Sequence, residues 1–292
     1  MGKLLRGLFQ VLLEFRSYAR IRPKVFVRPD NLGDAGVADF PDASKVLTQK
    51  VELRWPRLEL YNLLWQHLAN EPISEGLFRA GCREGYQIEW TEKGSVWAVP
   101  EVLRHDEEIQ RQLFHAITGP WMGKDRRRGF PYTWLPNHLG DAQRQVSPRS
   151  FLAALRRAAE DPPHASHSYA LYYESIKRGV QEASRIRVQE MQEDYPWVDT
   201  LMSPLSGLSV PCPFDRIEHV WRNNNVLDKL GQGMEAVAVK LPPAHLGDGA
   251  EGVRRDLEVL GVFQGMSDGR VNLPDVYRVG YGMRRRGGVK AI

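Results

Sequence analysis

The chain has 292 residues, a hydrophobic content of 42% and a formal net charge of +4, as expected for a soluble globular protein with one large domain or two to three small ones. The excess of 40 basic over 36 acidic residues is too small to indicate nucleic-acid binding by itself. Cys82 and Cys212 stand far apart and lack metal-ligand spacing, which excludes a disulfide scaffold and predicts reduced thiols in a cytosolic protein.

Residues 3–20 are predicted to form an amphipathic helix. Lys3, Arg6, Glu14 and Arg16 interrupt its apolar residues, so the uninterrupted run is far shorter than the roughly 20 residues that span a bilayer. No small-residue cleavage site follows, and a signal peptide is therefore not expected. We place the chain in the cytoplasm without a membrane partner and expect this helix to pack on a sheet.

Two short strands are predicted after this helix, over residues 24–28 and 49–53, and a further helix over residues 55–68. The order helix, strand, loop, strand, helix is typical of the end of an α/β unit. Two strands alone make a poor sheet because their faces and edges are not covered. The first 70 residues therefore look like part of a larger sheet.

Residues 71–194 are predicted to form a helical region, with helices over residues 101–118, 147–160 and 168–193. A loop with Lys or Arg at four of the five positions 124–128 follows the first of these helices. We place a domain boundary near residue 195, where the long third helix ends.

The helix that begins at Ser147 has clear local signals. Ser147 is suited to accept a backbone hydrogen bond as N-cap, and Pro148 fits the first helical position. Phe151 and Leu155 belong to an apolar face with helical spacing. Arg149 on the first turn is placed to project a fork of donors towards a phosphate. The alternative is that Arg149 covers apolar surface or pairs with a carboxylate.

The C-terminal part, residues 195–292, has a different pattern. Helices are predicted over residues 214–230 and 250–260, and an Asp268-Gly269 turn then joins two strand-like segments into a hairpin. Helices followed by a terminal hairpin suggest a winged helix.

A basic cluster closes the chain, and its members are Arg284, Arg285, Arg286 and Lys290. These side chains are a solvated tail, a contact for DNA or RNA phosphates, or a contact for a protein partner. Asp268 is the charged residue of the preceding turn, which weakens the picture of a DNA-binding wing.

The sequence contains no motif for a self-contained active site. Gly123-Lys124 is followed by Asp125 and lacks the preceding glycine of a P-loop, and nucleophile, zinc-protease and dinucleotide motifs are missing too. His164 and His167 lack a third zinc ligand. The loop after the first predicted strand is acidic and is expected to be solvated, with a catalytic carboxylate pair as the alternative; its carboxylates are Asp30, Asp34, Asp39 and Asp42.

The order of short motifs resembles the C-terminal half of a bacterial P-loop ATPase of the AAA-like/STAND group of signalling and conflict ATPases. The matching segments are Arg28-Pro29-Asp30 at a strand end, residues 45–55, Pro148-Arg149 at a helix start, and residues 272–278 and 284–288. The resemblance implies a mostly α protein with minor β (α+β). Residues 1–70 would be a remnant of the P-loop α/β sheet, residues 71–194 a helical lid and residues 195–292 a winged-helix-like domain.

The resemblance also implies roles for three residues. Arg28 or Asp30 would match the strand-end residue that senses the γ-phosphate, and Arg149 would match the lid arginine that contacts nucleotide. The Walker A and Walker B segments, which precede this region in such ATPases, are missing, so we expect no cofactor and no ATP hydrolysis in the chain alone. ATP and Mg²⁺ would bind only after completion by a P-loop-bearing N-terminal segment or a partner ATPase subunit.

Three interpretations remain open. In the first, the chain is a non-autonomous C-terminal portion of a regulatory ATPase that contributes sensor and lid residues and a winged-helix interaction module. In the second, it is a winged-helix DNA-binding regulator without ATPase activity. In the third, it is an enzyme, which requires Arg28, Asp30 and Arg149 to converge on one pocket.

Overall fold

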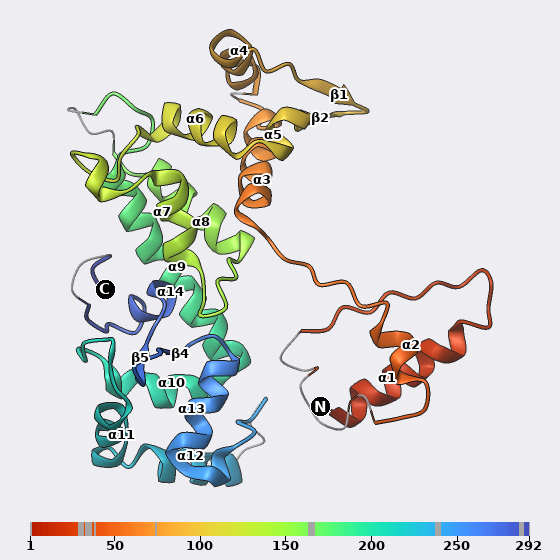
Figure 1. Cartoon of the computed structure of the whole chain (residues 1–292), viewed down its shortest axis with the longest axis vertical. Coiled ribbons are helices and arrows are strands. Elements are labelled where there is room, and N and C mark those ends of the chain that lie inside the picture. Colours follow the sequence, from red (N-terminus) through yellow and green to blue (C-terminus); the bar gives the residue numbers. More distant parts are fainter. Residues whose placement is uncertain are drawn as a thin grey trace. The chain divides into compact units, whose positions relative to one another are not determined.

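The computed structural model describes residues 2–28, 32, 37, 39–73, 75–162, 167–236, 241–285 and 289–291. The chain divides into two compact units, Met1–Arg54 and Trp55–Ile292, and each is described by itself. Helices dominate and the strands are few and short, so the prediction of a mostly α protein with minor β is confirmed (Figure 1).

The first unit is built on two helices, α1 (Gly2–Phe15) and α2 (Ala43–Leu47). Helix α1 is amphipathic and turns one apolar face into a small core, because its apolar residues recur every three or four positions. The buried residues of this core are Leu5, Phe9, Val37, Phe40 and Ala43.

The prediction of two strands in this unit was wrong. Residues 24–28 and 49–53 contain no strand. A strand needs a neighbour for its backbone hydrogen bonds, and no backbone hydrogen bond joins residues 22–27 or 51–55 to any other described residue. The apolar pattern therefore predicted two strands, but both segments lie outside any sheet.

The second unit begins with a layer of helices and one hairpin. Its elements are α3 (Arg57–Ala69), α4 (Glu75–Tyr86), β1 (Thr91–Lys93), β2 (Val96–Ala98), α5 (Glu101–His105) and α6 (Glu107–Thr118). Strands β1 and β2 pair antiparallel, with Glu92 opposite Trp97. The predicted single helix over 101–118 is two helices, because the Asp106 side chain accepts hydrogen bonds from the backbone N–H groups of Glu108 and Ile109 and starts α6. Helix α3, which we had placed in the first segment, belongs to the second unit.

Three further helices complete the first of two apolar cores in this unit: α7 (Pro131–Leu139), α8 (Pro148–Ala159) and α9 (Tyr173–Asp194). Helix α8 packs closely along α9. A Cβ added at Gly179 of α9 would lie 2.1 Å from the carbonyl oxygen of Ala154, so the two backbones approach where the glycine has no side chain. The ring of Tyr61 on α3 stacks on that of Tyr132 on α7, with centroids 4.2 Å apart.

The C-terminal part combines short helices with a three-stranded antiparallel sheet of order β3-β5-β4. Its elements are α10 (Pro196–Met202), β3 (Cys212–Pro213), α11 (Phe214–Asn223), α12 (Val226–Ala236), α13 (Gly249–Val259), β4 (Gln264–Gly265), β5 (Arg270–Asn272) and α14 (Asp275–Arg278). The predicted hairpin is confirmed, with Gln264 opposite Asn272. The predicted helix over 214–230 is two helices, divided where Asn225 adopts a positive φ of 49°.

Helix α9 connects the two apolar cores of this unit. Ile176 and Val180 of α9 belong to the core around α3 and α6–α8, whereas Val188 and Met191 belong to the C-terminal core. The boundary that we predict near residue 195 falls at the junction of α9 and α10, within the second unit. The chain's end returns to the first core, because Val289 is buried there.

Candidate functional site

Arg149 lies on the first turn of α8, as predicted. Pro148 occupies the first turn, and Phe151 and Leu155 are buried on the predicted apolar face. Ser147 occupies the N-cap position as predicted, but its side chain makes no cap hydrogen bond. The extended Ser147 instead offers its carbonyl oxygen to the backbone N–H of Phe151 at 3.0 Å, so the helix start depends on backbone geometry and proline.

The guanidinium of Arg149 forms an ion pair with Glu190 of α9, with Nη1 2.7 Å from Oε1. The other carboxylate oxygen of Glu190 lies 3.3 Å from Nη1 of Arg187. Arg187 also donates from Nε to the hydroxyl of Tyr277 at 3.2 Å. Arg149 is largely exposed, and a pair of this kind contributes about 0–1 kcal/mol. The structure thus gives Arg149 the carboxylate partner that was left open as the alternative.

The other two sensor candidates lie in the first unit. Arg28 is exposed at the end of an extended segment. Asp30 lies outside the described residues, as do Asp34 and His164. Arg28 and Arg149 belong to different units, and the third interpretation, a single pocket formed by these residues, stays a prediction.

The C-terminal cations have different surroundings. Arg284 is exposed, and its backbone N–H donates to the carbonyl of Leu208 at 2.9 Å. Arg285 lies with Nη1 3.4 Å from Oδ1 of Asp275. The Lys290 carbonyl accepts a hydrogen bond from Nε2 of Gln181 at 3.1 Å. Arg286 lies outside the described residues.

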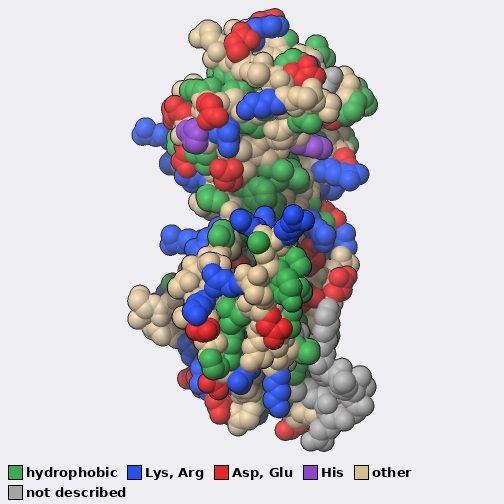
Figure 2. Space-filling view, turned by 90° about the vertical axis from the view of Figure 1, so that its right-hand side faces the viewer, with side chains coloured by type: hydrophobic (Ala, Val, Ile, Leu, Met, Phe, Trp, Pro, Cys, Tyr) green, Lys and Arg blue, Asp and Glu red, His purple; other side chains and the backbone are tan. Residues whose placement is uncertain are grey.

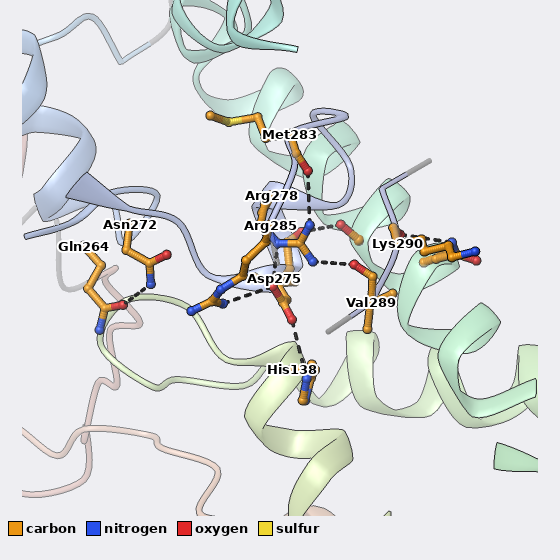
Figure 3. Close-up of polar contacts among 12 residues, drawn as sticks. His138, Gln264, Asn272, Asp275, Arg278, Met283, Arg285, Val289 and Lys290 are labelled. Atoms are coloured by element: carbon orange, nitrogen blue, oxygen red, sulfur yellow. Dashed lines mark hydrogen bonds and ion pairs between the residues drawn. The ribbon is translucent and has the colours of Figure 1, made fainter. Parts of the chain in front are cut away.

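A buried ionic network, whose Asp275 also contacts Arg285, was not predicted from the sequence. Arg278 is 1% exposed, and its Nε donates to Oδ1 of Asp275 at 2.6 Å. Its two terminal nitrogens donate to the carbonyl oxygens of Met283 at 3.1 Å and Val289 at 2.6 Å. Figure 3 shows this guanidinium between the carboxylate and the returning chain. A buried arginine needs such partners, because an unpaired buried charge is costly.

His138 of α7 completes the network. Its Nε2 lies 3.5 Å from Oδ2 of Asp275, and its Nδ1 is 2.8 Å from the carbonyl oxygen of Trp134 (Figure 3). Burial lowers the pKa of His138, and the nearby carboxylate of Asp275 opposes that shift. The network thereby joins α7, α14 and the C-terminal segment. Its sequence signal, an acid and an arginine three residues apart after Pro274, is common on helix surfaces and did not identify it.

Cys82 and Cys212 are both free and buried, as predicted for reduced thiols, and burial raises the pKa of Cys82 to about 11. Within the part of the chain that the structure describes, no group of three or more His, Cys, Asp or Glu side chains could hold a metal ion. The same residues include no helix with the length and apolar character needed to cross a membrane.

The fold and this network define a mostly helical protein whose C-terminal segment is fixed by a buried arginine. Comparisons with protein-family models, with curated proteins and with solved structures found no match to this chain.

Proposed function

We propose that the chain is the C-terminal portion of a regulatory P-loop ATPase. It contributes lid and sensor residues and an interaction module. A separate segment that carries the P-loop completes the nucleotide site. The order of the motifs from Arg28 to Arg286 supports this proposal. The observation that carries it is the apolar surface of the first unit.

Helix α1 has a second apolar face that its own unit leaves exposed. Leu4, Leu8 and Val11 are exposed to 76%, 39% and 44%. Their spacing of four and three residues places them in one stripe, beside the stripe that contains the buried Leu5 and Phe9. A helix that is apolar on two faces is typical of a helix packed between two layers.

The extended segments of this unit are also apolar and exposed. Phe26, Val51 and Leu53 are exposed to 81%, 79% and 75%. Residues 22–27 and 51–55 have no backbone hydrogen bond to other described residues. Extended chain with unpaired backbone groups and apolar side chains is a template for strand pairing. In Figure 2, hydrophobic side chains are visible among the charged ones on the face that is drawn.

These features favour one occupant, the strands of a sheet that carries a P-loop. Such strands would supply backbone partners to the two extended segments and a layer for the exposed stripe of α1. Arg28 follows the first extended segment, so pairing would place it at a strand end. The exposed pair of Arg149 with Glu190 would then open at a cost of about 1 kcal/mol or less, which leaves Arg149 available to a nucleotide.

The C-terminal part supports the role of an interaction module. Three helices and a hairpin follow β3, and on this order of elements we propose a winged-helix-like module. The turn of the hairpin is not basic, because Asp268 pairs with Arg270 at 2.7 Å. Arg285 is engaged by Asp275. These charges favour a protein partner over DNA at this surface.

The proposal is tested by co-expressing the chain with the polypeptide encoded directly upstream of Met1, which we expect to contain Walker A and Walker B. The two should co-purify. The substitutions Leu8→Asp and Val11→Asp should each weaken the complex at least tenfold, because they place a charge in the exposed stripe. Gln10→Asp, an exposed position of α1 outside both apolar stripes, is the matched control and should leave the complex intact. Equal binding by all three variants would contradict the proposal.

A further inference from the structure

A cationic loop between α6 and α7 is not used by the proposed function. We define residues 122–129 as the arginine loop. Four of these residues are cations and one is a carboxylate; the charged residues are Lys124, Asp125, Arg126, Arg127 and Arg128. The loop follows α6 in Figure 1.

The loop is held in one shape by its own hydrogen bonds. The backbone N–H of Met122 donates to the carbonyl of Gly129 at 2.9 Å and closes the loop. Asp125 caps the 3₁₀ turn Arg126–Arg128 by accepting from the backbone N–H of Arg127 at 2.9 Å. Met122 is buried and anchors the base. A fixed loop loses little conformational entropy when it binds a ligand.

The cationic side chains of the loop point into solvent. Lys124, Arg126 and Arg128 are exposed and have no ion pair with any residue that the structure describes. Arg127 pairs with Asp125 at 3.0 Å but is still 86% exposed. The stem of Arg128 crosses Gly123, where an added Cβ would lie 2.7 Å from its Cγ. The loop thus presents several guanidinium groups from one rigid base.

The geometry of the turn selects among anionic ligands. In a 3₁₀ turn, three consecutive side chains point in directions about 120° apart. A single small anion cannot meet three guanidinium groups that diverge in this way. A chain with regularly spaced anions can meet them one after another, and phosphate is the anion that the guanidinium fork matches in a bidentate manner.

Aromatic rings flank the loop. The rings of Trp121 and Phe130 lie next to each other with centroids 4.9 Å apart, and Trp121 is partly exposed. Tyr169 is 40% exposed and covers Gly119, where an added Cβ would lie 2.9 Å from its ring. Cations beside accessible rings are typical of surfaces that bind the backbone and bases of single-stranded nucleic acid.

We propose that the arginine loop binds the phosphate backbone of a nucleic acid, with single strands preferred and without base-sequence specificity. The site is separate from the C-terminal cations and does not depend on a P-loop segment. The proposal of nucleic-acid binding can therefore be tested independently of the proposed ATPase role.

The experiment measures fluorescence anisotropy of a labelled 20-nucleotide single strand with the full chain, over a series of salt concentrations. Arg126→Gln/Arg127→Gln/Arg128→Gln should lower the affinity at least tenfold and reduce the slope of log K against log salt by about 2, since each lost phosphate contact removes about 0.7 from the slope. Arg83→Gln/Lys93→Gln/Lys229→Gln is the matched control, because it removes the same charge from exposed, scattered positions. Its slope should equal that of the unmodified chain.

The single substitution Arg126→Gln is a second variant that should leave folding unchanged, because this exposed side chain has no ion-pair partner among the described residues. It should reduce the slope by about 0.7, with an unchanged melting temperature. The proposal is overturned if the unmodified chain does not bind the strand at low salt, or if the loop variant and the control lose affinity equally. It is also overturned if labelled oligoglutamate binds as tightly as the strand and loses binding in the loop variant, because the loop would then recognise an acidic protein.

Discussion

The guanidinium of Arg278 and the carboxylate of Asp275 form a hydrogen-bonded ion pair, with Nε 2.6 Å from Oδ1, and both side chains are buried. The same guanidinium binds the carbonyls of Met283 and Val289. One side chain therefore connects α14 to the segment that ends the chain. The exposed cations Arg284 and Lys290 are positioned by this buried arginine.

Replacing Arg278 by Met should lower the free energy of unfolding by about 3–5 kcal/mol, because it removes the closest partner of the buried Asp275 carboxylate and the donors to the carbonyls of Met283 and Val289. The measurement is urea denaturation followed by tryptophan fluorescence. Arg284→Gln is the control on the exposed neighbour and should change the free energy of unfolding by less than about 0.5 kcal/mol. Similar values for the two variants would show that the buried pair does not fix this segment.

The close approach of α8 and α9 predicts that Gly179→Ala is destabilising by about 1–3 kcal/mol, since the new methyl group would meet the Ala154 carbonyl oxygen at 2.1 Å. Gly81 of α4 provides the comparison, because nothing lies within 4 Å of a Cβ added there. Gly81→Ala should raise the stability by about 0.5–1 kcal/mol through helix propensity. Thermal unfolding measures both, and a melting temperature that is unchanged or raised by Gly179→Ala contradicts the packing.

Stability should decrease on acidification in part because of His138. Burial lowers its pKa in the folded state, so the unfolded chain binds the proton more readily. The contribution of His138 is present above the unfolded pKa of about 6.5 and is lost as the pH falls below it. The groups that face it are Asp275, Arg278, Arg285 and the Trp134 carbonyl.

When the pH falls from 7.5 to 5.5, the free energy of unfolding of the His138→Gln variant should therefore decrease less than that of the unmodified chain. Urea denaturation at the two pH values gives the difference for each protein. If the variant loses as much as the unmodified chain, protonation of His138 does not contribute.

The thiols should be unreactive in the folded protein. Burial raises the pKa of Cys82 to about 11, and it also raises the pKa of Cys212. Thiolate is the reactive form, so iodoacetamide at pH 8 should label neither residue until urea unfolds the chain. Mass spectrometry of the labelled peptides gives the result, and rapid labelling of Cys82 in the native protein would contradict its burial.

Local patterns predicted the elements whose signals lie within one segment. The apolar face of α8, helical structure over residues 214–230, helix α13 and the hairpin after it were predicted from spacing and turn residues. The breaks at Asp106 and Asn225 were missed, because a side-chain cap and a positive φ interrupt an otherwise continuous helical pattern. The strands at residues 24–28 and 49–53 were wrong because strand formation depends on a partner strand.

The candidate site was less predictable than the fold. Arg149 was identified by its place on a helix, but its partner Glu190 lies 41 residues away, and no local pattern joins them. Arg278 was overlooked because burial of an arginine depends on acceptors from separate segments, here Asp275, Met283 and Val289. Contacts of this kind are set by tertiary packing, which the spacing of residues in one helix does not encode.

The most direct measurement is titration calorimetry of Mg-ATP, first into the isolated chain and then into the chain joined to the P-loop-bearing segment that we propose as its partner. We predict no binding heat for the isolated chain, because its sequence contains no P-loop motif to hold the phosphates. The joined protein should bind Mg-ATP saturably, and Arg149→Gln should weaken that binding, whereas the exposed Arg156→Gln of the same helix should not. Tight binding of Mg-ATP by the isolated chain would contradict the proposed dependence on a second segment.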